Sequence, residues 1–178
     1  MRIKKYTVEE ALDNPIGTKK LEEIIRPKDK IVIVTSDITR PMPSYKVLPN
    51  ILKRLKKSGV KKENISIIFA LGSHRKHTKE EKIKLVGEEI YKSIICKDSS
   101  EEDFINMGKT SCGTPILINK TVAEADIRIC LGNIEYHYFA GYSGGAKAIM
   151  PGVSNREAIQ SNHSKMVEKG AEVGRLED

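Results

Sequence analysis

The stretch KIVIVTSDITRP, residues 30–41, decides how the chain is expected to fold. Its first half holds an unbroken run of β-branched residues, and its second half is a polar turn that ends on a proline. An apolar run without polar alternation predicts a strand buried on both faces, as in a parallel sheet covered on each side. Ligands bind such sheets outside the carboxyl ends of the strands, so this polar turn is the first candidate site.

Four further apolar runs predict strands over residues 65–71, 93–96, 115–118 and 126–131. Helices are expected between and after them, over residues 43–58, 78–86, 101–107, 122–125 and 154–168. Pro43 suits a first helical turn, Gly59 suits a C-terminal cap, and the segment from Thr78 to Glu81 is a capping box. Strands that alternate with helices predict a single-domain α/β fold. We expect it to be doubly wound and Rossmann-like, with a mainly parallel sheet, helices on both faces and right-handed crossovers.

The composition argues against a nucleic-acid partner. The chain of 178 residues carries 31 Lys+Arg and 24 Asp+Glu, which gives a net charge of +7. Its densest basic cluster, within residues 53–62, contains no aromatic residue on which a base could stack. We therefore expect this cluster to be a solvated helix face.

Membrane association and secretion are not expected either. The longest apolar run has five residues, 67–71, which is too short to span a bilayer, and no apolar signal core follows Met1. The cysteines have no metal-binding spacing and predict buried, reduced thiols in a cytoplasmic protein. They are Cys96, Cys112 and Cys130.

Polar residues follow two more of the predicted strands at the same edge of the sheet. GSHRKHT, residues 72–78, follows the second run, and GNIEYH, residues 132–137, follows the last. His74 is either an ordinary exposed loop histidine or a proton carrier, the role that suits a crevice histidine at neutral pH. His77 directly precedes the helix cap and is expected to shape the turn, so His74 is preferred as the proton carrier.

The turn after the first strand contains Asp37 and Arg40. One interpretation is an aspartate that caps the turn and pairs with a surface arginine. The other is functional, because an arginine at the sheet edge suits a carboxylate or phosphate, which its planar group binds at two points.

A glycine-rich stretch leads from the last strand into Lys147. Gly141, Gly144 and Gly145 allow close approach of the backbone and offer amide groups to an anion. The stretch departs from the phosphate-binding pattern GxxxxGK[ST], because alanines occupy the second glycine position and the hydroxyl position. An ordinary nucleotide triphosphatase is therefore not expected. Lys147 is either a surface lysine or a group that binds phosphate or acts as an amine nucleophile.

His163 lies in the last predicted helix. Ile159, Met166 and Val167 are spaced to share its face, so His163 is expected to point inward. It is either a core histidine or a metal ligand. No second ligand stands four residues away, so a metal there would need ligands from elsewhere, such as a cofactor.

Four segments occur in the order TSDITRP, GSHR, HYFAGYSGGAKAIMPG and SNH between residues 35 and 163. In order and spacing they resemble the amino-terminal domain of the nickel-dependent lactate racemase family. The long HYFAGYSGGAK segment, residues 137–147, is the most specific part of this resemblance.

The resemblance implies a cofactor of the nickel-pincer nucleotide type (nickel pyridinium-3,5-bisthiocarboxylic acid mononucleotide). Two sulfur-containing arms of this nucleotide hold nickel together with a ring carbon. Lys147 would anchor the cofactor covalently through a thioamide, and His163 would supply the protein's ligand to nickel. His74 and His137 would be the acid/base pair, and Arg40 would contact the substrate carboxylate. The other implied cofactor contacts are Asp37, Gly141, Gly144 and Gly145.

The implied activity is that of an isomerase, which racemises lactate or a related 2-hydroxy acid by hydride transfer. The Cα hydrogen of such an acid is too weakly acidic for imidazole to remove as a proton. It leaves more easily as hydride when a base takes the hydroxyl proton with it. Return of the hydride to the other face of the planar 2-oxo acid inverts the centre, so a base is needed on each side. Separate cofactor-synthesis proteins would supply the nucleotide, and protein made without them would be apo.

Enzymes of this family carry a second, carboxy-terminal domain that closes over the cofactor. Residues 1–178 match only the amino-terminal, cofactor-binding domain. We therefore expect that the carboxy-terminal domain is absent, so that the chain is either an incomplete fragment or a stand-alone domain. The chain alone is expected to bind the nucleotide but to racemise poorly or not at all. Two alternatives are a non-catalytic nucleotide-binding module, which would not need the histidines, and a zinc hydrolase, which would need closer ligand spacing.

Overall fold

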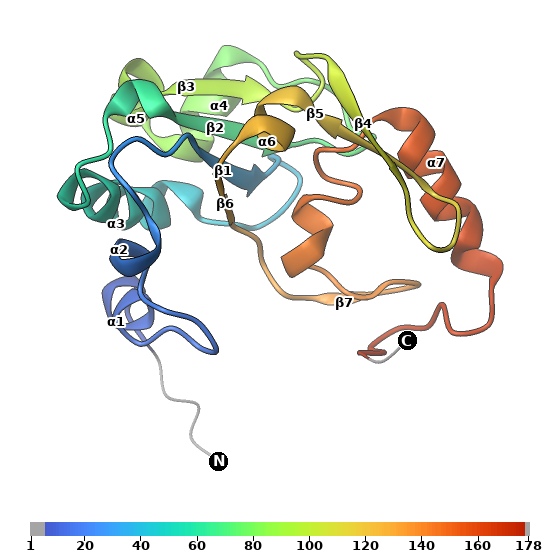
Figure 1. Ribbon diagram of the computed structural model, residues 1–178. Helices are drawn as coiled ribbons and strands as arrows, with labels where there is room; N and C mark the ends of the chain where they lie inside the picture. The colour runs from blue at the N-terminus through green and yellow to red at the C-terminus, as the bar shows by residue number, and fades with distance from the viewer. Residues whose placement is uncertain (1–5, 177–178) are drawn as a thin grey trace.

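The computed structural model describes residues 6–176 and contains a four-stranded parallel sheet (Figure 1). Its strands are β1 (Ile31–Ser36), β2 (Ile65–Ala70), β3 (Ile95–Asp98) and β6 (Ile127–Cys130). Their order is β3-β2-β1-β6, and every neighbouring pair is parallel. The chain order therefore reverses between β1 and β6, which opens a crevice at the carboxyl ends of these two strands.

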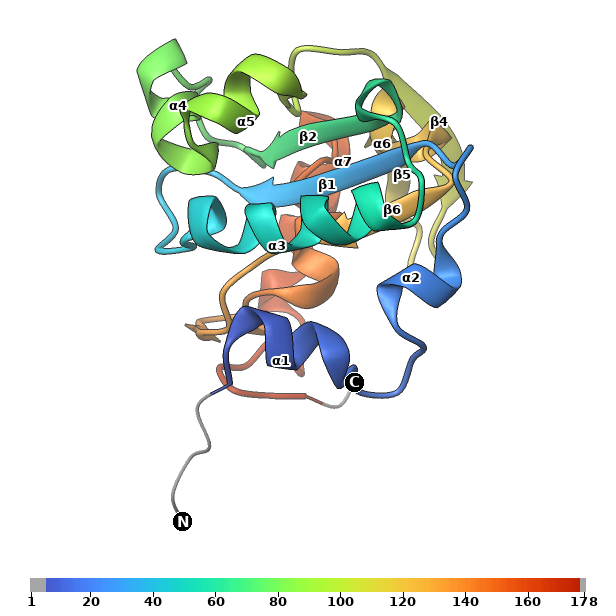
Figure 2. The ribbon, with the colours of Figure 1, turned by 90° about the vertical axis from the view of Figure 1, so that its left-hand side faces the viewer.

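Helices cover both faces of this sheet, as predicted. One face carries α3 (Ser44–Lys57), α4 (Lys79–Val86) and α5 (Glu88–Ser93), and the other carries α6 (Lys120–Glu124) and α7 (Arg156–His163). Figure 2 shows α3 on the near side of the sheet, alongside β1, with α7 on the far side. The predicted capping box opens α4. The Thr78 hydroxyl oxygen accepts the Glu81 amide at 3.3 Å, and the Glu81 carboxylate accepts the Thr78 amide at 2.9 Å.

The first four residues of β1 are apolar because both faces of the strand are buried. Ile31 and Ile33 belong to a core beneath α3, α4 and α5, whereas Val32 and Val34 belong to a second core on the opposite face. All four side chains are at most 2% exposed. Their alternation between two apolar cores explains the absence of polar residues within the run.

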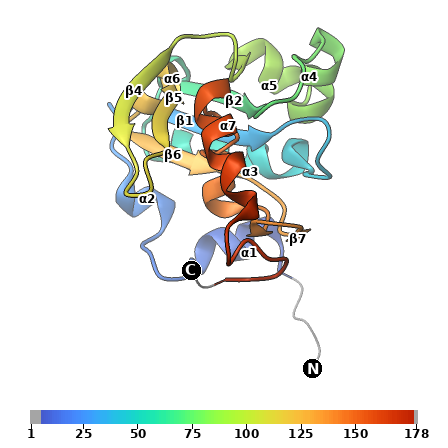
Figure 3. The same ribbon diagram turned by 90° about the vertical axis from the view of Figure 1, so that its right-hand side faces the viewer.

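The predicted helix over residues 101–107 is wrong. This region forms β4 (Phe104–Lys109), which pairs antiparallel with β5 (Pro115–Asn119) in a separate hairpin (Figure 3). The predicted strand at 115–118 therefore exists but does not join the parallel sheet. The turn between β4 and β5 favours this antiparallel pairing. Gly113 takes a φ of +81°, and the Thr110 amide donates to the Thr114 carbonyl at 2.9 Å.

The last helix is shorter than predicted. Asn155 caps α7 by accepting the Ala158 amide at 2.8 Å, and α7 ends at His163, where a 3-10 turn (Ser164–Val167) follows. Val167 is 86% exposed and Met166 is 43% exposed, so the apolar face expected around these two residues is wrong. The 3-10 turn is wound more tightly than an α-helix, so both side chains point away from the face that they would share with His163 in a continuous α-helix.

Two of the cysteines also differ from expectation. Cys112 and Cys130 are exposed, and only Cys96 is partly buried. Burial raises the pKa of the Cys96 thiol to about 12. Within residues 6–176, no helix combines the length and the apolar character that a membrane-spanning helix requires.

Two unpredicted helices, α1 (Val8–Asp13) and α2 (Leu21–Ile24), are held against α3 by Arg54. Its guanidinium donates to Glu22 at 2.9 Å and to Asp13 at 3.0 Å, and the Arg54 side chain is 10% exposed. The basic cluster at residues 53–62 is therefore not a wholly solvated face. Lys53, which precedes Arg54 in this cluster, does lie at the surface, where it pairs with Glu9.

Replacement of Arg54 is expected to destabilise the domain far more than replacement of its neighbour. Arg54→Met removes hydrogen bonds to two carboxylates and should lower the free energy of unfolding by about 2 kcal/mol. Lys53→Met removes only an exposed ion pair and should change it by less than about 0.5 kcal/mol. Urea unfolding of the two variants tests this contrast, and equal losses would contradict the anchoring role of Arg54.

Candidate functional site

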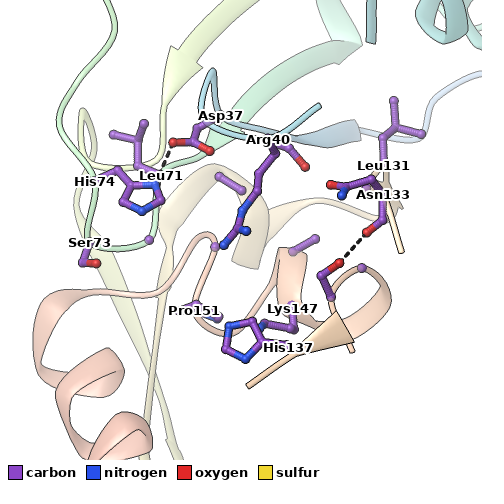
Figure 4. Close-up of a pocket in the computed structure, with 18 of the residues that line it drawn as sticks. Asp37, Arg40, Leu71, Ser73, His74, Leu131, Asn133, His137, Lys147 and Pro151 are labelled. Atoms are coloured by element: carbon purple, nitrogen blue, oxygen red, sulfur yellow. Dashed lines mark hydrogen bonds and ion pairs between the residues drawn. The ribbon is translucent and has the colours of Figure 1, made fainter. Parts of the chain in front are cut away.

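A cavity of about 380 Å³ lies at the carboxyl edge of the parallel sheet (Figure 4). Its walls come from the turns after β1, β2 and β6, from the glycine-rich stretch and from the end of α7. The volume falls within the range of small-molecule sites. Seven of the predicted site residues line this one cavity: Asp37, Arg40, His74, His137, Gly144, Lys147 and His163.

His74 is held by a buried carboxylate. Its Nδ1 lies 2.7 Å from Oδ2 of Asp37, whose side chain is 3% exposed, whereas the His74 side chain is 43% exposed. The Thr39 hydroxyl donates to the other Asp37 oxygen at 2.9 Å. A carboxylate at Nδ1 favours the tautomer with its proton on that nitrogen, which leaves Nε2 as a proton acceptor. Both Asp37 oxygens already have partners, so Asp37 orients His74 from behind.

The side chain of Arg40 extends from the β1 turn toward the space between His74 and His137 (Figure 4). Within residues 6–176 its guanidinium forms no ion pair, so the surface pairing with Asp37 considered from the sequence is not formed. An unpaired guanidinium in a cavity is suited to a bound carboxylate or phosphate.

His137 lies in a small hairpin and faces the cavity from the side opposite His74 (Figure 4). The hairpin consists of β7 (Tyr136–His137) and β8 (Gly141–Tyr142). Burial lowers the pKa of His137, and the positive charges of Lys147 and Arg40 and the nearby His163 lower it further. Its Nδ1 lies 3.3 Å from the Ala140 amide nitrogen, a long contact that fixes the tautomer only weakly. A lowered pKa favours the neutral ring, the form that accepts a proton.

Lys147 brings an amine into the same cavity. It belongs to a short 3-10 turn, and its Nζ lies 5.9 Å from the centre of the Phe139 ring. Burial lowers the pKa of Lys147 to about 8, and the charge of Arg40 contributes to the decrease. A larger fraction of this amine is therefore neutral near physiological pH than in an ordinary lysine, and the neutral amine is the nucleophile.

His163 reaches the cavity from the end of α7. Its ring packs edge-to-face on Phe139 with centroids 5.4 Å apart, and no hydrogen bond to its ring nitrogens occurs within residues 6–176. The same part of the chain holds no cluster of three or more His, Cys, Asp or Glu side chains that could bind a metal ion. A metal at His163 would take its other ligands from a bound group.

The three predicted glycines occupy different positions. Gly144 lines the cavity with a φ of +83°, and a β-carbon there would come within 3.1 Å of the Asn133 carbonyl oxygen. Gly141 and Gly145 do not line this cavity and border a second hollow, which Gly144 also lines. A β-carbon at Gly141 would overlap the Arg175 carbonyl, so this glycine serves close backbone packing.

Two residues that the sequence analysis did not single out also line the cavity. Phe139 contacts His137, Lys147 and His163 through its ring. The Nδ2 atom of Asn133 is buried and has no hydrogen-bond partner within the described residues. Buried donors are normally paired, so an unpaired donor in a cavity wall indicates a place for a ligand oxygen.

The end of β3 joins the turns around the cavity, and sequence reasoning missed it. The Ser99 hydroxyl donates to the Gly152 carbonyl at 3.2 Å and accepts the Leu71 amide at 3.2 Å. Asp98, fully buried, accepts from the His77 ring at 2.6 Å. Both residues follow a predicted strand at the ligand-binding edge, and this position was the available signal.

The chain is similar to known proteins over most of its length. The family described as "Lactate racemase N-terminal domain" matches residues 2–174. The chain is 43% identical over 161 residues to a lactate racemase of Lactiplantibacillus plantarum, and 40% identical over 159 residues to one of Thermoanaerobacterium thermosaccharolyticum. These alignments cover 89% and 88% of the chain but only 38% and 37% of the two relatives. The chain thus spans a little over a third of the length of these curated relatives.

Solved structures support the predicted fold. The lactate racemase apoprotein from T. thermosaccharolyticum superposes with a TM-score of 0.89 at 38% identity, covering 96% of this chain and 42% of that one. A Thermotoga maritima protein superposes with a TM-score of 0.77 at 22% identity, covering 96% and 44%, and shows the shared fold alone.

Lys147 is expected to titrate near pH 8. The test is NMR titration of the chain with its lysines carrying ¹³C-methyl groups, with Lys147→Arg to identify the signal. Arg40→Gln should raise the midpoint while leaving it below the ordinary value of 10.5, because burial is the larger cause. Arg75→Gln, which removes an arginine paired with Glu81, should leave it unchanged. A midpoint above about 10 in the unaltered chain would contradict the assignment.

Proposed function

Because the chain belongs to the lactate racemase N-terminal domain family, we propose that it carries the acid/base and cofactor-anchoring groups of a 2-hydroxy acid racemase. The proposed substrate is lactate or a close relative of it. The observation that carries this proposal is the placement of His74, with Asp37 behind it, across one cavity from His137 and Lys147.

The two histidines suit proton transfer on opposite sides of a substrate. Asp37 holds His74 so that Nε2 can accept the proton of a substrate hydroxyl and can later return it. His137 favours its neutral form because its pKa is lowered. When the opposite enantiomer is bound, His137 performs the same proton transfer from its own side.

Arg40 orients the substrate. Its guanidinium forms no ion pair within the described residues and can bind the carboxylate of a 2-hydroxy acid at two points. The unpaired Nδ2 of Asn133 offers one further donor to a ligand oxygen. Among the residues that the structure describes, the only carboxylate that lines the cavity is that of Asp37, which is engaged with His74, so the wall suits an anionic ligand.

The residues of the cavity fit a nickel-pincer nucleotide. Lys147 has the half-buried, readily deprotonated amine that covalent attachment requires, and His163 has an imidazole without a hydrogen-bond partner in the described chain. Gly144 leaves the backbone open for close approach of a ligand. When bound, such a nucleotide supplies nickel and an electrophilic ring that take up hydride from the substrate and return it. The proposed partners are therefore the proteins that synthesise and deliver this nucleotide.

Turnover also needs the site to be closed to water, because water screens the charges on which the reaction depends. The His74 side chain is 43% exposed, so the cavity is open on that side. Assays of turnover should therefore include the carboxy-terminal region of the T. thermosaccharolyticum relative, added as a separate fragment.

Co-expression with cofactor-synthesis proteins is expected to place a nucleotide-sized adduct on Lys147. Intact mass and peptide mapping would locate the adduct, and metal analysis should find about one nickel per adduct. Lys147→Arg should abolish the adduct, whereas Lys165→Arg, at a lysine that lies outside the cavity, should retain it. An unmodified Lys147 in a nickel-loaded preparation would contradict the proposal.

Loss of either histidine is expected to slow conversion of L-lactate to D-lactate. His74→Gln and His137→Gln should each reduce turnover at least ~100-fold, the usual scale for acid/base groups. Lys76→Gln, an exposed neighbour of His74 in sequence, should retain turnover. Chiral chromatography of lactate, incubated with the cofactor-loaded protein and the carboxy-terminal fragment of the relative, measures this. Near-normal turnover in either histidine variant would exclude the pairing.

A further inference from the structure

Of the four histidines in the chain, His77 lies behind the site and does not line the cavity. The side chain of His77 is fully buried, and its ring packs edge-to-face on Phe69 with centroids 5.2 Å apart. The acid/base chemistry proposed above does not use it. Unlike an ordinary turn histidine, it hydrogen-bonds through both ring nitrogens.

The partners of His77 fix its tautomer. Nδ1 lies 2.6 Å from Oδ1 of Asp98, a carboxylate that can only accept, so Nδ1 carries the proton. Nε2 lies 3.0 Å from the Ile38 backbone nitrogen, which donates, so Nε2 accepts. A ring that donates at one nitrogen and accepts at the other is neutral and has a single orientation.

Asp98 is itself fixed by several donors. Its Oδ2 accepts the His77 backbone amide at 3.0 Å and lies 3.3 Å from Nζ of Lys82. Lys82 in turn donates to Glu101 at 2.8 Å. The side chains of Asp98 and Lys82 are 0% and 9% exposed. A buried network in which each polar group has a partner is rigid, and it restricts the motion of any backbone group that is hydrogen-bonded to it.

The group at the end of this network is the peptide between Asp37 and Ile38. Ile38, whose amide donates to His77, directly follows Asp37 in the chain. Oδ2 of Asp37 lies 2.7 Å from Nδ1 of His74. The connection therefore runs from the end of β3, through His77, to the turn after β1 and back to His74. Without His77, the Ile38 amide would lose its acceptor, and the turn that carries Asp37 and Arg40 would lose its connection to β3.

We propose that His77 is a positioning residue that holds the Asp37–Ile38 peptide and so sets the carboxylate of Asp37 against His74. The catalytic meaning of this role rests on the proposed function above. The positioning itself is a property of the chain without cofactor and can be measured separately.

Two substitutions test whether His77 acts through its hydrogen bond to the Ile38 amide or only by filling space. His77→Gln can still reach the Ile38 amide, because its side-chain carbonyl oxygen extends about as far as Nε2. His77→Asn matches only the Nδ1 position, so it keeps the hydrogen bond to Asp98 and loses the one to Ile38. Arg54→Met is the control for lowered stability, because it acts on the contact of α3 with α1 and α2 and not on the cavity.

The experiment is NMR of the ¹⁵N-labelled, 178-residue chain. In the unaltered chain, a scalar coupling across the hydrogen bond should join the Ile38 amide nitrogen to Nε2 of His77. At a pH where its ring is neutral, His74 should carry its proton on Nδ1. His77→Asn should speed exchange of the Ile38 amide about tenfold, the factor that corresponds to one lost hydrogen bond. It should also shift His74 toward the other tautomer. His77→Gln and Arg54→Met should leave both signals close to those of the unaltered chain.

The coupling in the unaltered chain needs no variant, so its absence would overturn the proposal even if His77→Asn fails to fold. An unchanged His74 tautomer in folded His77→Asn would overturn it as well. In the cofactor-loaded protein, His77→Asn should lower kcat about tenfold, less than loss of His74, while adduct formation on Lys147 and KM persist. If the loaded protein shows no turnover even with the carboxy-terminal fragment of the relative added, the proposed function fails, whereas the coupling and the tautomer still decide the role of His77.

Discussion

The parallel register of β1 with its two neighbours is the constraint on which the site depends. Ile31 lies level with Ile65 of β2 and with Ile127 of β6, so all three strands end at one edge of the sheet. Side chains of β1 pack alternately into two apolar cores, and its backbone pairs with β2 on one side and β6 on the other, which holds the three strands in this register. The turns that carry Asp37 and His74 therefore meet, although they are separated by a helix in the chain.

The chemistry of the cavity depends on the small number of acidic groups that line it within residues 6–176. Asp37 lies behind His74 and orients it, so the charges that face the interior are those of Arg40 and Lys147. Their proximity and burial lower the pKa of Lys147 to about 8 and also lower the pKa of His137. One arrangement thus provides an anion-binding group, a nucleophilic amine and the neutral ring of His137, and the proposed racemisation of a 2-hydroxy acid would use all three.

Local signals predicted most of the fold, and long-range contacts account for what was missed. The apolar run of β1 and the capping box at Thr78 can be read within a few residues, and both are present. The strand β4 was predicted as a helix because its state depends on pairing with β5. The same limit applies to the site. Polar residues at strand ends predicted the position of His74, but no short pattern connects Asp98 to His77 or predicts that Arg54 is buried.

The central claim is that this cavity inverts a 2-hydroxy acid by moving hydride within the site while histidine moves the hydroxyl proton. The most direct test is the fate of L-lactate labelled with deuterium at C2, incubated in ordinary water with the cofactor-loaded protein and the carboxy-terminal fragment of the relative. Chiral separation with mass detection reads both the enantiomer and the label. The account predicts that D-lactate forms and retains its deuterium. D-lactate without deuterium would indicate proton exchange with water and would contradict the account.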